Sequence, residues 1–261
     1  MIQVPKSRMD RIAPLFSTSA DTLIRSCLEG CMGRAWADDF EHPTAAKICT
    51  TDFCFLSGDA DSPDAGALAA ALPEGYAHPW FYVVPMQPAW EAVIERSFPG
   101  RYTPIRRYAL QKDGDTFAPE ALKRFAAQVP EGCRILPFDE SIYYLSKQEE
   151  WSSHLCAWFP TYESFQKHGM GFAAFDGKTL VCGASSHSYY QEGIEVEIDT
   201  NPTHLRRGLA TACAAALILE CLRRGLYPSW DAANQESLAL AEKLGYRFDR
   251  EYKAYQVATS I

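Results

Sequence analysis

Residues 194–224 restrict the fold of this chain more than any other stretch. Apolar residues alternate with acidic ones from Ile194 to Asp199, which predicts a strand with one buried and one polar face. A short turn follows, and the run at 209–224 is apolar on nearly every side before Gly225. Such a run predicts a helix buried against a sheet, with the glycine just past its end. A strand, a turn and a buried helix in this order predict an α/β fold.

The turn between the two elements contains residues that suit a phosphate group. Arg206 and Arg207 precede Gly208, where the predicted helix begins. A helix N-terminus presents unpaired N–H groups and partial positive charge, and glycine lets a ligand approach the backbone closely. On these residues alone, an ordinary junction with solvated arginines is the favoured interpretation. Neither the P-loop motif nor the dinucleotide-binding glycine motif occurs in this turn.

Charge and hydropathy exclude some classes of partner. The chain has 261 residues and a net charge of −8, which argues against nucleic-acid binding because phosphate backbones need a basic surface. An acidic protein mildly favours cationic substrates such as amines. The N-terminus lacks the apolar segment of a signal peptide, and the longest apolar run, 212–219, is far shorter than the ~20 residues that span a bilayer. We therefore expect a cytoplasmic protein with no membrane segment.

The cysteines indicate a reduced protein without a metal site. Nine are present, an odd number, and no C-x-x-C pair occurs. The nearest approach to a ligand cluster is His42, Cys49 and Cys54, whose spacing matches no zinc site. Buried free thiols are the favoured interpretation, and no metal is expected.

The chain divides into two halves of similar length that both mix strands with helices. Pro130, Glu131 and Gly132 form a turn signal, so we predict an N-terminal α/β domain at 1–130 and a second domain at 131–261. The first domain is a candidate for a degenerate copy of the second, although the sequence shows no clear internal repeat.

Two motifs in the second half resemble the GNAT superfamily of acetyltransferases. The first is 202–211, where the family has Arg/Gln-x-x-Gly-x-Gly/Ala at a strand-to-helix junction. The second runs from Trp230 to Asn234 and on to Ser237, Leu240 and the Lys-Leu-Gly-Tyr of 243–246. The resemblance covers roughly residues 130 to 257 and is close to a subgroup with the string Glu-Ile-Asp-Thr before the first motif.

The resemblance implies a mixed, mostly antiparallel sheet flanked by helices, and acetyl-CoA as cosubstrate. It implies backbone contacts to the pantetheine arm, N–H contacts to the pyrophosphate, and contacts near the thioester. The residues implied for the pantetheine arm are Ile198, Asp199 and Thr200. Those implied for the pyrophosphate are Arg206, Arg207, Gly208, Leu209, Ala210 and Thr211, and those implied near the thioester are Asn234 and Ser237. Ser237 is also a candidate cap of the last helix. The chain departs from the family at Leu205, and at Ala241, where many members have a tyrosine that protonates the thiolate.

The catalytic candidates are the acidic residues of the alternating strand. Direct transfer needs a neutral amine, an acceptor for its proton and a donor to the carbonyl oxygen. Glu197 is the first candidate for base or amine anchor and Glu195 the second; a solvated acidic stripe is an equally open interpretation. His187 is a weaker candidate, and Ser237 or Tyr246 could replace the missing tyrosine.

These features together predict an N-acetyltransferase that moves an acetyl group from acetyl-CoA to the primary amine of a small molecule. The amine attacks directly, without metal. The alternative is a non-catalytic sensor that binds acyl-CoA, which the alanine at 241 favours. A homodimer is compatible with either function.

Overall fold

The computed structural model describes residues 1–259 and divides into two compact units. The first unit comprises Met1–Arg107 and the C-terminal segment from Glu251, and the second is Tyr108–Arg250. The chain leaves the first unit within strand β6 (Tyr102–Leu110) and returns within β13 (Phe248–Ala258).

This division differs from the boundary expected at residue 130. The turn at 130–132 lies inside the second unit, between helix α4 (Pro119–Ala127) and strand β7 (Cys133–Pro137). Leu122 of α4 is buried in the same apolar core as Leu217 of helix α8 (Leu209–Arg223). Because this packing joins α4 to the second unit, a strong turn signal does not mark a domain boundary here.

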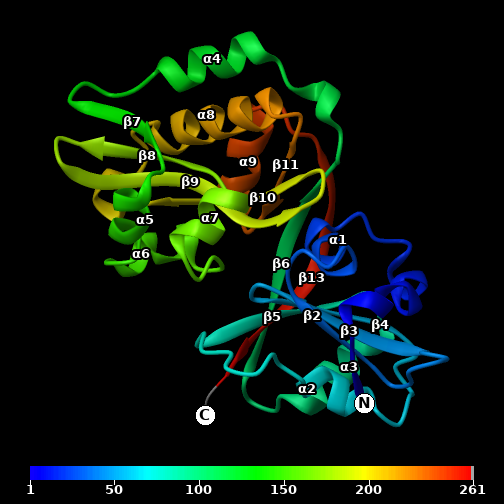
Figure 1. Ribbon diagram of the computed structural model, residues 1–261. Coiled ribbons are helices and arrows are strands. Elements are labelled where there is room, and N and C mark those ends of the chain that lie inside the picture. The colour runs from blue at the N-terminus through cyan, green and yellow to red at the C-terminus, as the bar shows by residue number, and fades with distance from the viewer. Residues whose placement is uncertain (260–261) are drawn as a thin grey trace. The chain divides into compact units, whose positions relative to one another are not determined.

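A five-stranded sheet forms the centre of the second unit (Figure 1). Its strands lie in the order β11, β10, β9, β8, β7, and all neighbours are antiparallel except β10 and β11, which are parallel. The bounds are β8 Gly171–Asp176, β9 Thr179–Tyr190, β10 Gly193–Thr200 and β11 Tyr227–Ser229. Gly177, with φ +58°, lies in the turn between β8 and β9.

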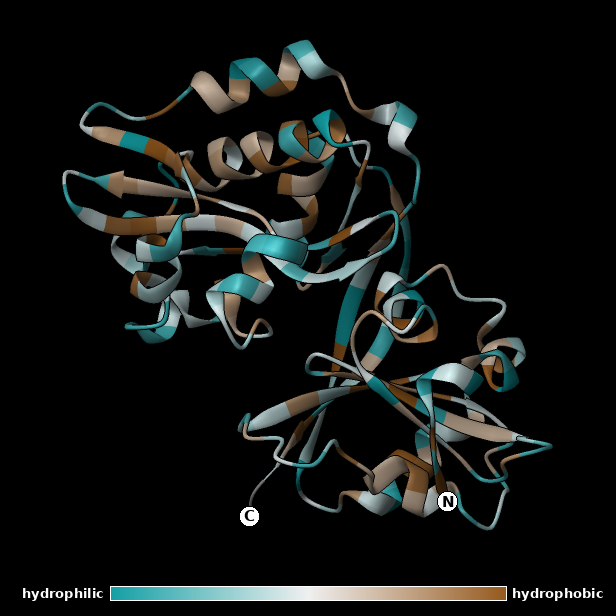
Figure 2. Cartoon of the chain, viewed as in Figure 1, coloured by the Kyte–Doolittle hydropathy of each residue, from teal (hydrophilic) through white to brown (hydrophobic). Residues whose placement is uncertain are grey.

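Helices cover both faces of this sheet. Helices α4 and α8 lie on one face, where Ile194 and Val196 of β10 are buried. The other face packs against the segment that links β7 to β8, through Leu155 and Phe159 among others. That segment contains α5 Glu140–Ser146, α6 Glu150–Ser153, the 3-10 helix η4 His154–Cys156 and α7 Tyr162–His168. Helix α8 is apolar along most of its length, whereas α4 alternates hydrophilic and hydrophobic residues (Figure 2).

The first unit is built on a second sheet. Its strands lie in the order β1, β2, β3, β4, β5, β13, β6, with β4 and β5 parallel. The strands not yet given are β1 Ile2–Val4, β2 Arg34–Ala37, β3 Ala45–Thr50, β4 Phe53–Gly58 and β5 Trp80–Pro85. Its helices are η1 Lys6–Arg11, η2 Ala13–Phe16, α1 Thr22–Leu28, α2 Ala65–Ala70 and α3 Ala89–Ser97.

The two units share one connectivity. Each has a strand, a helical segment and three further strands that complete an antiparallel set. A helix, α2 or α8, then leads to a fifth strand parallel to the fourth, and a last helix follows, α3 or α9 (Gln235–Lys243). The mixed, mostly antiparallel α/β fold predicted for the second half is confirmed, and the first unit repeats its order of elements.

The remaining short elements are η3 Gly114–Thr116, η5 Pro202–His204 and β12 Asp231–Ala232. Among the residues described, no helix has the length and apolar character needed to cross a membrane.

Candidate functional site

Strands β10 and β11 separate after three paired residues, which leaves an open strand edge. Their last register pair is Glu195 with Ser229, and β12, which continues β11, pairs instead with β6. The Tyr227 N–H donates to the Glu192 carbonyl, so the even-numbered residues of β10 direct their main-chain groups toward β11. Beyond Glu195 that side has no strand partner among the described residues. Val196, Ile198 and Thr200 therefore present main-chain donors and acceptors at the opening.

Asp199 differs from its neighbours in this respect. The odd-numbered residues of β10 direct their main-chain groups toward β9, as the Asn201 N–H does in donating to the Val181 carbonyl, so the main chain of Asp199 faces away from the open edge. Of the three residues expected to bind a pantetheine arm through the backbone, Ile198 and Thr200 have the required direction, and Val196 joins them.

The turn before α8 has the backbone conformation of an anion-binding loop. Arg206 has φ +60° and Gly208 has φ +84°, so left-handed residues flank Arg207. The first helical bond of α8 runs from the Ala212 N–H to the Gly208 carbonyl, which leaves the N–H groups of 209–211 without intrahelical partners. A Cβ on Gly208 would meet no atom within 4 Å. Unpaired donors at a helix N-terminus beside open space suit a phosphate.

The two arginines of the turn have different surroundings. Arg207 Nη1 donates to Asp176 Oδ2 at 3.1 Å, and His204 Nε2 lies 3.3 Å from the same oxygen. The Arg207 hydrogen bond, followed by that of His204, holds the pKa of Asp176 below its ordinary value. Arg207 thus ties the turn to the β8–β9 hairpin. Arg206 is exposed and has no side-chain partner within residues 1–259, so its guanidinium is available to a ligand.

The start of α9 supplies two more polar groups. Asn234 caps the helix: its side-chain oxygen accepts from the Ser237 N–H at 2.8 Å. The expectation that Ser237 itself caps α9 was wrong, because its hydroxyl oxygen instead accepts from Trp230 Nε1 at 3.2 Å. Asn234 keeps its amide N–H groups, and Ser237 keeps a hydroxyl proton to donate.

The family's tyrosine position and its possible substitute are both buried. Ala241 has no exposed surface and packs in the core of the second unit. Tyr246 is 4% exposed, and its hydroxyl donates to the Pro228 carbonyl. Tyr246 therefore packs in the core of the second unit and has no free hydroxyl proton to donate. Of the two proposed substitutes, only Ser237 retains an available donor.

The acidic residues of β10 lie on the sheet face that packs against the β7–β8 segment. Ser185, opposite Glu197, donates to the Leu155 carbonyl, and Leu155 covers Gly183, opposite Asp199. A β-bulge places His187 as the extra residue of β9 between the partners of Glu195 and Val196. His187 Nδ1 lies 2.9 Å from Glu197 Oε2, and the Trp158 ring meets the imidazole edge-on at 6.1 Å. A carboxylate can only accept a hydrogen bond, so this contact favours the His187 tautomer that has its proton on Nδ1.

Burial divides the three carboxylates. Glu195 is 6% exposed, and the Glu197 side chain is 25% exposed. Burial raises the pKa of Asp199 to about 8, with smaller contributions from the negative charges of Glu197 and Cys182, against an opposing effect of His187. Its Oδ2 is buried and has no hydrogen-bond partner among residues 1–259. A carboxyl group with a pKa near neutrality beside a second carboxyl group is an arrangement suited to proton transfer.

The structure brings most of the predicted residues together along β10 and its turn. Two functional candidates were underrated in the sequence: His187, whose orientation depends on a bulge, and the side chain of Asp199. The sequence could predict that Asp199 lies on the same strand face as Glu195 and Glu197, because it follows the same alternation. It could not predict that the Asp199 carboxyl group is buried. No group of His, Cys, Asp and Glu in the described part of the chain has the arrangement of a metal site.

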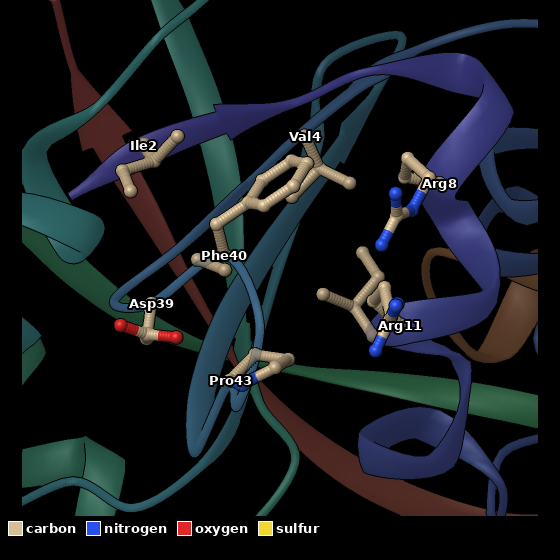
Figure 3. Close-up of a pocket in the computed structure, with 9 residues that line it drawn as sticks. Ile2, Val4, Arg8, Arg11, Asp39, Phe40 and Pro43 are labelled. Atoms are coloured by element: carbon tan, nitrogen blue, oxygen red, sulfur yellow. The ribbon is translucent and has the colours of Figure 1, made fainter.

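The first unit has a shallow hollow of its own near the N-terminus (Figure 3). Arg8 lies over the Phe40 ring at 5.0 Å. Arg8 and Arg11 also lie 3.9 and 3.4 Å from the Glu41 carboxylate. Because both guanidinium groups face this carboxylate, the hollow has little net positive charge to offer an anion.

Comparison with known proteins is consistent with this geometry. Residues 13–255 match the GNAT acetyltransferase family, so the match includes both units. The chain belongs to this family, whose members generally use acetyl-CoA.

Individual relatives match along nearly the whole chain. A Bacillus subtilis (strain 168) protein described as uncharacterized N-acetyltransferase YdfB is 26% identical over 260 residues, 97% of each chain. The crystal structure of a GCN5-related N-acetyltransferase-like protein from Streptococcus suis 89/1591 is 38% identical, with a TM-score of 0.87 over 96% of this chain and 98% of that one. A tandem GNAT protein from the clavulanic acid biosynthesis pathway, 12% identical, shares the fold with a TM-score of 0.56 over 100% of this chain and 98% of its own.

Proposed function

We propose that this protein transfers an acetyl group from acetyl-CoA to the primary amine of a small molecule at the β10–β11 opening. The observation that carries the proposal is the combination of an open strand edge with an anion-binding turn at the end of the same strand. Acetyl-CoA is a long ligand that contains a pyrophosphate and, joined to it, a pantetheine arm that ends in the acetyl thioester. The turn at 206–211 and the edge at 196–200 provide donors for both parts, consecutively along the chain.

Each residue of the site then has a defined task. N–H groups of 209–211 and the Arg206 side chain hold the pyrophosphate, and the main chain of Val196, Ile198 and Thr200 pairs with the pantetheine arm. The bound cosubstrate supplies an activated acetyl thioester. Arg207 positions the turn through Asp176 rather than contacting phosphate directly.

The acidic side chains of β10 are proposed to bind the acceptor amine and to take up its proton. An amine is protonated at neutral pH, and a carboxylate attracts the ammonium form and accepts its proton. Glu197 is the proposed base because it is the more exposed glutamate and His187 fixes its position. Glu195, which is more buried, is the second candidate for this role. Ser237 is the proposed donor to the departing thiolate, since its hydroxyl proton remains available.

A panel of small primary amines incubated with acetyl-CoA tests the proposal, with free thiol release and product mass as readouts. Turnover of at least one amine, together with binding of acetyl-CoA by calorimetry, is the expected result. Tight binding of acetyl-CoA without transfer to any amine supports the second candidate, a non-catalytic sensor. The observation that favours a sensor is the buried Ala241 at the position where the family often has its proton donor.

A further inference from the structure

Two cysteines of the first unit face each other across a tight hairpin. Cys49 of β3 is in register with Cys54 of β4, and their Sγ atoms lie 2.6 Å apart. Both residues are 1% exposed. Neither belongs to the proposed acetyl-transfer site, which lies in the second unit.

The register gives these cysteines a spacing that allows a disulfide. The Asp59 N–H donates to the Thr44 carbonyl, so this pair occupies a hydrogen-bonding position, and such positions alternate along an antiparallel ladder. Counting along the register makes Cys49 and Cys54 a non-hydrogen-bonded pair. Such pairs have Cα atoms about 4.5 Å apart, within the range of disulfides. A bond requires the sulfurs to close by only about 0.6 Å.

A buried lysine lies on the same face of this hairpin. Lys47 has no exposed surface and is two residues before Cys49, so their side chains share a face. Its ammonium group donates to the carbonyls of Ala69 and Ala71 at 2.7 and 2.6 Å, at the end of α2. A buried cation needs compensation by negative charge or by dipoles, and a thiolate beside it provides the former.

The two thiols are chemically unequal. Burial acts to raise the pKa of Cys54, but the hydrogen bond from Cys49 and the charge of Lys47 outweigh it, and the pKa is lowered. Burial and the same hydrogen bond raise the pKa of Cys49 well above its ordinary value. Cys54 is thus the nucleophile of the pair, and Cys49 is the resolving cysteine, which attacks the oxidised sulfur of Cys54.

We propose that Cys49, Cys54 and Lys47 form a dithiol redox site that a small hydroperoxide oxidises to an intramolecular disulfide. In the first step the Cys54 thiolate attacks one peroxide oxygen, the O–O bond breaks, and hydroxide leaves to take up a proton as water. The sulfur becomes a sulfenic acid. In the second step the Cys49 sulfur attacks the Cys54 sulfur, the S–O bond breaks, and a second water leaves with the Cys49 proton. One peroxide and two thiols give one disulfide and two waters.

Hydrogen peroxide titration of the full chain, followed by denaturing alkylation and peptide mass mapping, tests the site. Trypsin cleaves after Lys47 and Arg96, so both cysteines lie in one peptide. The expected product is this peptide lighter by two hydrogen atoms and without alkyl groups. Cys27 of the same unit is an internal comparator: it is also 1% exposed, and burial raises its pKa to about 12. We expect the pair to react at least about tenfold faster than Cys27 at pH 7.

Variants and pH separate the roles of the three residues. Cys49→Ala should stop the reaction at Cys54 with one added oxygen, trapped by a cyclic dione. Lys47→Met should slow the oxidation in a folded protein. Should that variant not fold, the wild-type rate is measured against pH, and it should level off below about 8.5, the ordinary pKa of a cysteine. Alkylation of both cysteines at doses that oxidise Cys27, or a rate still rising through pH 9, overturns the proposal.

Discussion

The two parallel crossovers of this protein share a topology but differ in the loop that each one carries. In the second unit, β10 leads through Arg206, Arg207 and Gly208 into a helix of 15 residues. In the first unit, β4 leads through Asp59, Asp61 and Asp64 into a helix of six residues. Carboxylates repel a pyrophosphate where arginines attract it, and the short α2 has a smaller dipole.

The strand edges differ as well. β4 stays paired with β5 up to Leu56, and the Met86 N–H donates to the Leu56 carbonyl beyond the last pair. Gln87 accepts from the Gly58 N–H, and the Trp90 indole donates to the Gly58 carbonyl. In the first unit, side chains thus occupy the edge of β4 that corresponds to the open edge of β10 in the second unit. The comparison shows that the first unit keeps the strand order of the second, while its own side chains fill the strand edge at which the second unit is proposed to bind acetyl-CoA.

The largest expected effect concerns the carboxylates, which β10 has and β4 lacks. Glu197→Gln keeps an oxygen that accepts from His187 but removes the base, so turnover of the best amine should fall about 10²- to 10⁴-fold. Affinity for acetyl-CoA should stay within about twofold, because the proposed cosubstrate contacts in this strand are main-chain. The control is Glu192→Gln, an exposed residue in the β9–β10 turn. If Glu197→Gln turned over the amine at the wild-type rate, Glu197 would not act as a base, and the acidic residues of β10 would form only a solvated stripe.

The second prediction concerns the turn and uses both ends of α8. Gly208 has φ +84° and Gly225 has φ +70°, and a Cβ at either meets no atom within 4 Å. Valine at either position should strain the backbone by a similar amount, about 1–2 kcal/mol. Only Gly208→Val should weaken acetyl-CoA binding, by about 10²-fold in calorimetry, because it blocks approach to the turn. Equal affinities of the two folded variants would remove the turn from the site.

The third prediction concerns Asp199 and the dependence of stability on pH. Its pKa is raised to about 8 in the folded protein, from 3.8 for an ordinary aspartate. Between these values the folded state holds a proton that the unfolded state has released, so this group lowers stability as pH rises from 4 to 8. Asp199→Asn removes that loss. Its Tm should match wild type near pH 4 and exceed it by about 10 °C or more at pH 8.5. A constant difference at every pH would contradict the shifted pKa.

Local signals in the sequence predicted the elements of the site well. The alternation at 194–199 and the apolar run after Gly208 correspond to β10 and α8, because period and glycine placement act over a few residues. The GNAT resemblance extended the prediction to roughly residues 130 to 257, which leaves out α4 at the start of the second unit. The order of the strands in the sheet was not predicted and is known from the structure.

Features that depend on distant residues could not be predicted in this way. The bulge that turns His187 toward Glu197 depends on the β9–β10 register. The boundary at residue 107 depends on the packing of α4 against α8, and the capping role of Asn234 depends on which side chain reaches the Ser237 N–H. Each is a tertiary outcome that a local pattern leaves open.

The smallest expected effect comes from removing one charge in the loop before α8, compared with removing one in the loop before α2. Arg206 is exposed without a side-chain partner, so Arg206→Gln removes a cation that only a ligand would use. Its loss should weaken acetyl-CoA binding about fivefold, since one exposed charge-assisted contact is screened by solvent and salt. The matched change in the first unit is Asp61→Asn, also at an exposed loop position before its helix. That variant should bind acetyl-CoA within about twofold of wild type, because Asp61 is not part of the proposed site and the effect of an exposed charge outside it is screened by salt. Raising the salt concentration should shrink the Arg206 effect and leave the Asp61 variant unchanged. If Asp61→Asn instead altered affinity as much as Arg206→Gln, the first loop would take part in binding, and the view of a closed first copy would fail.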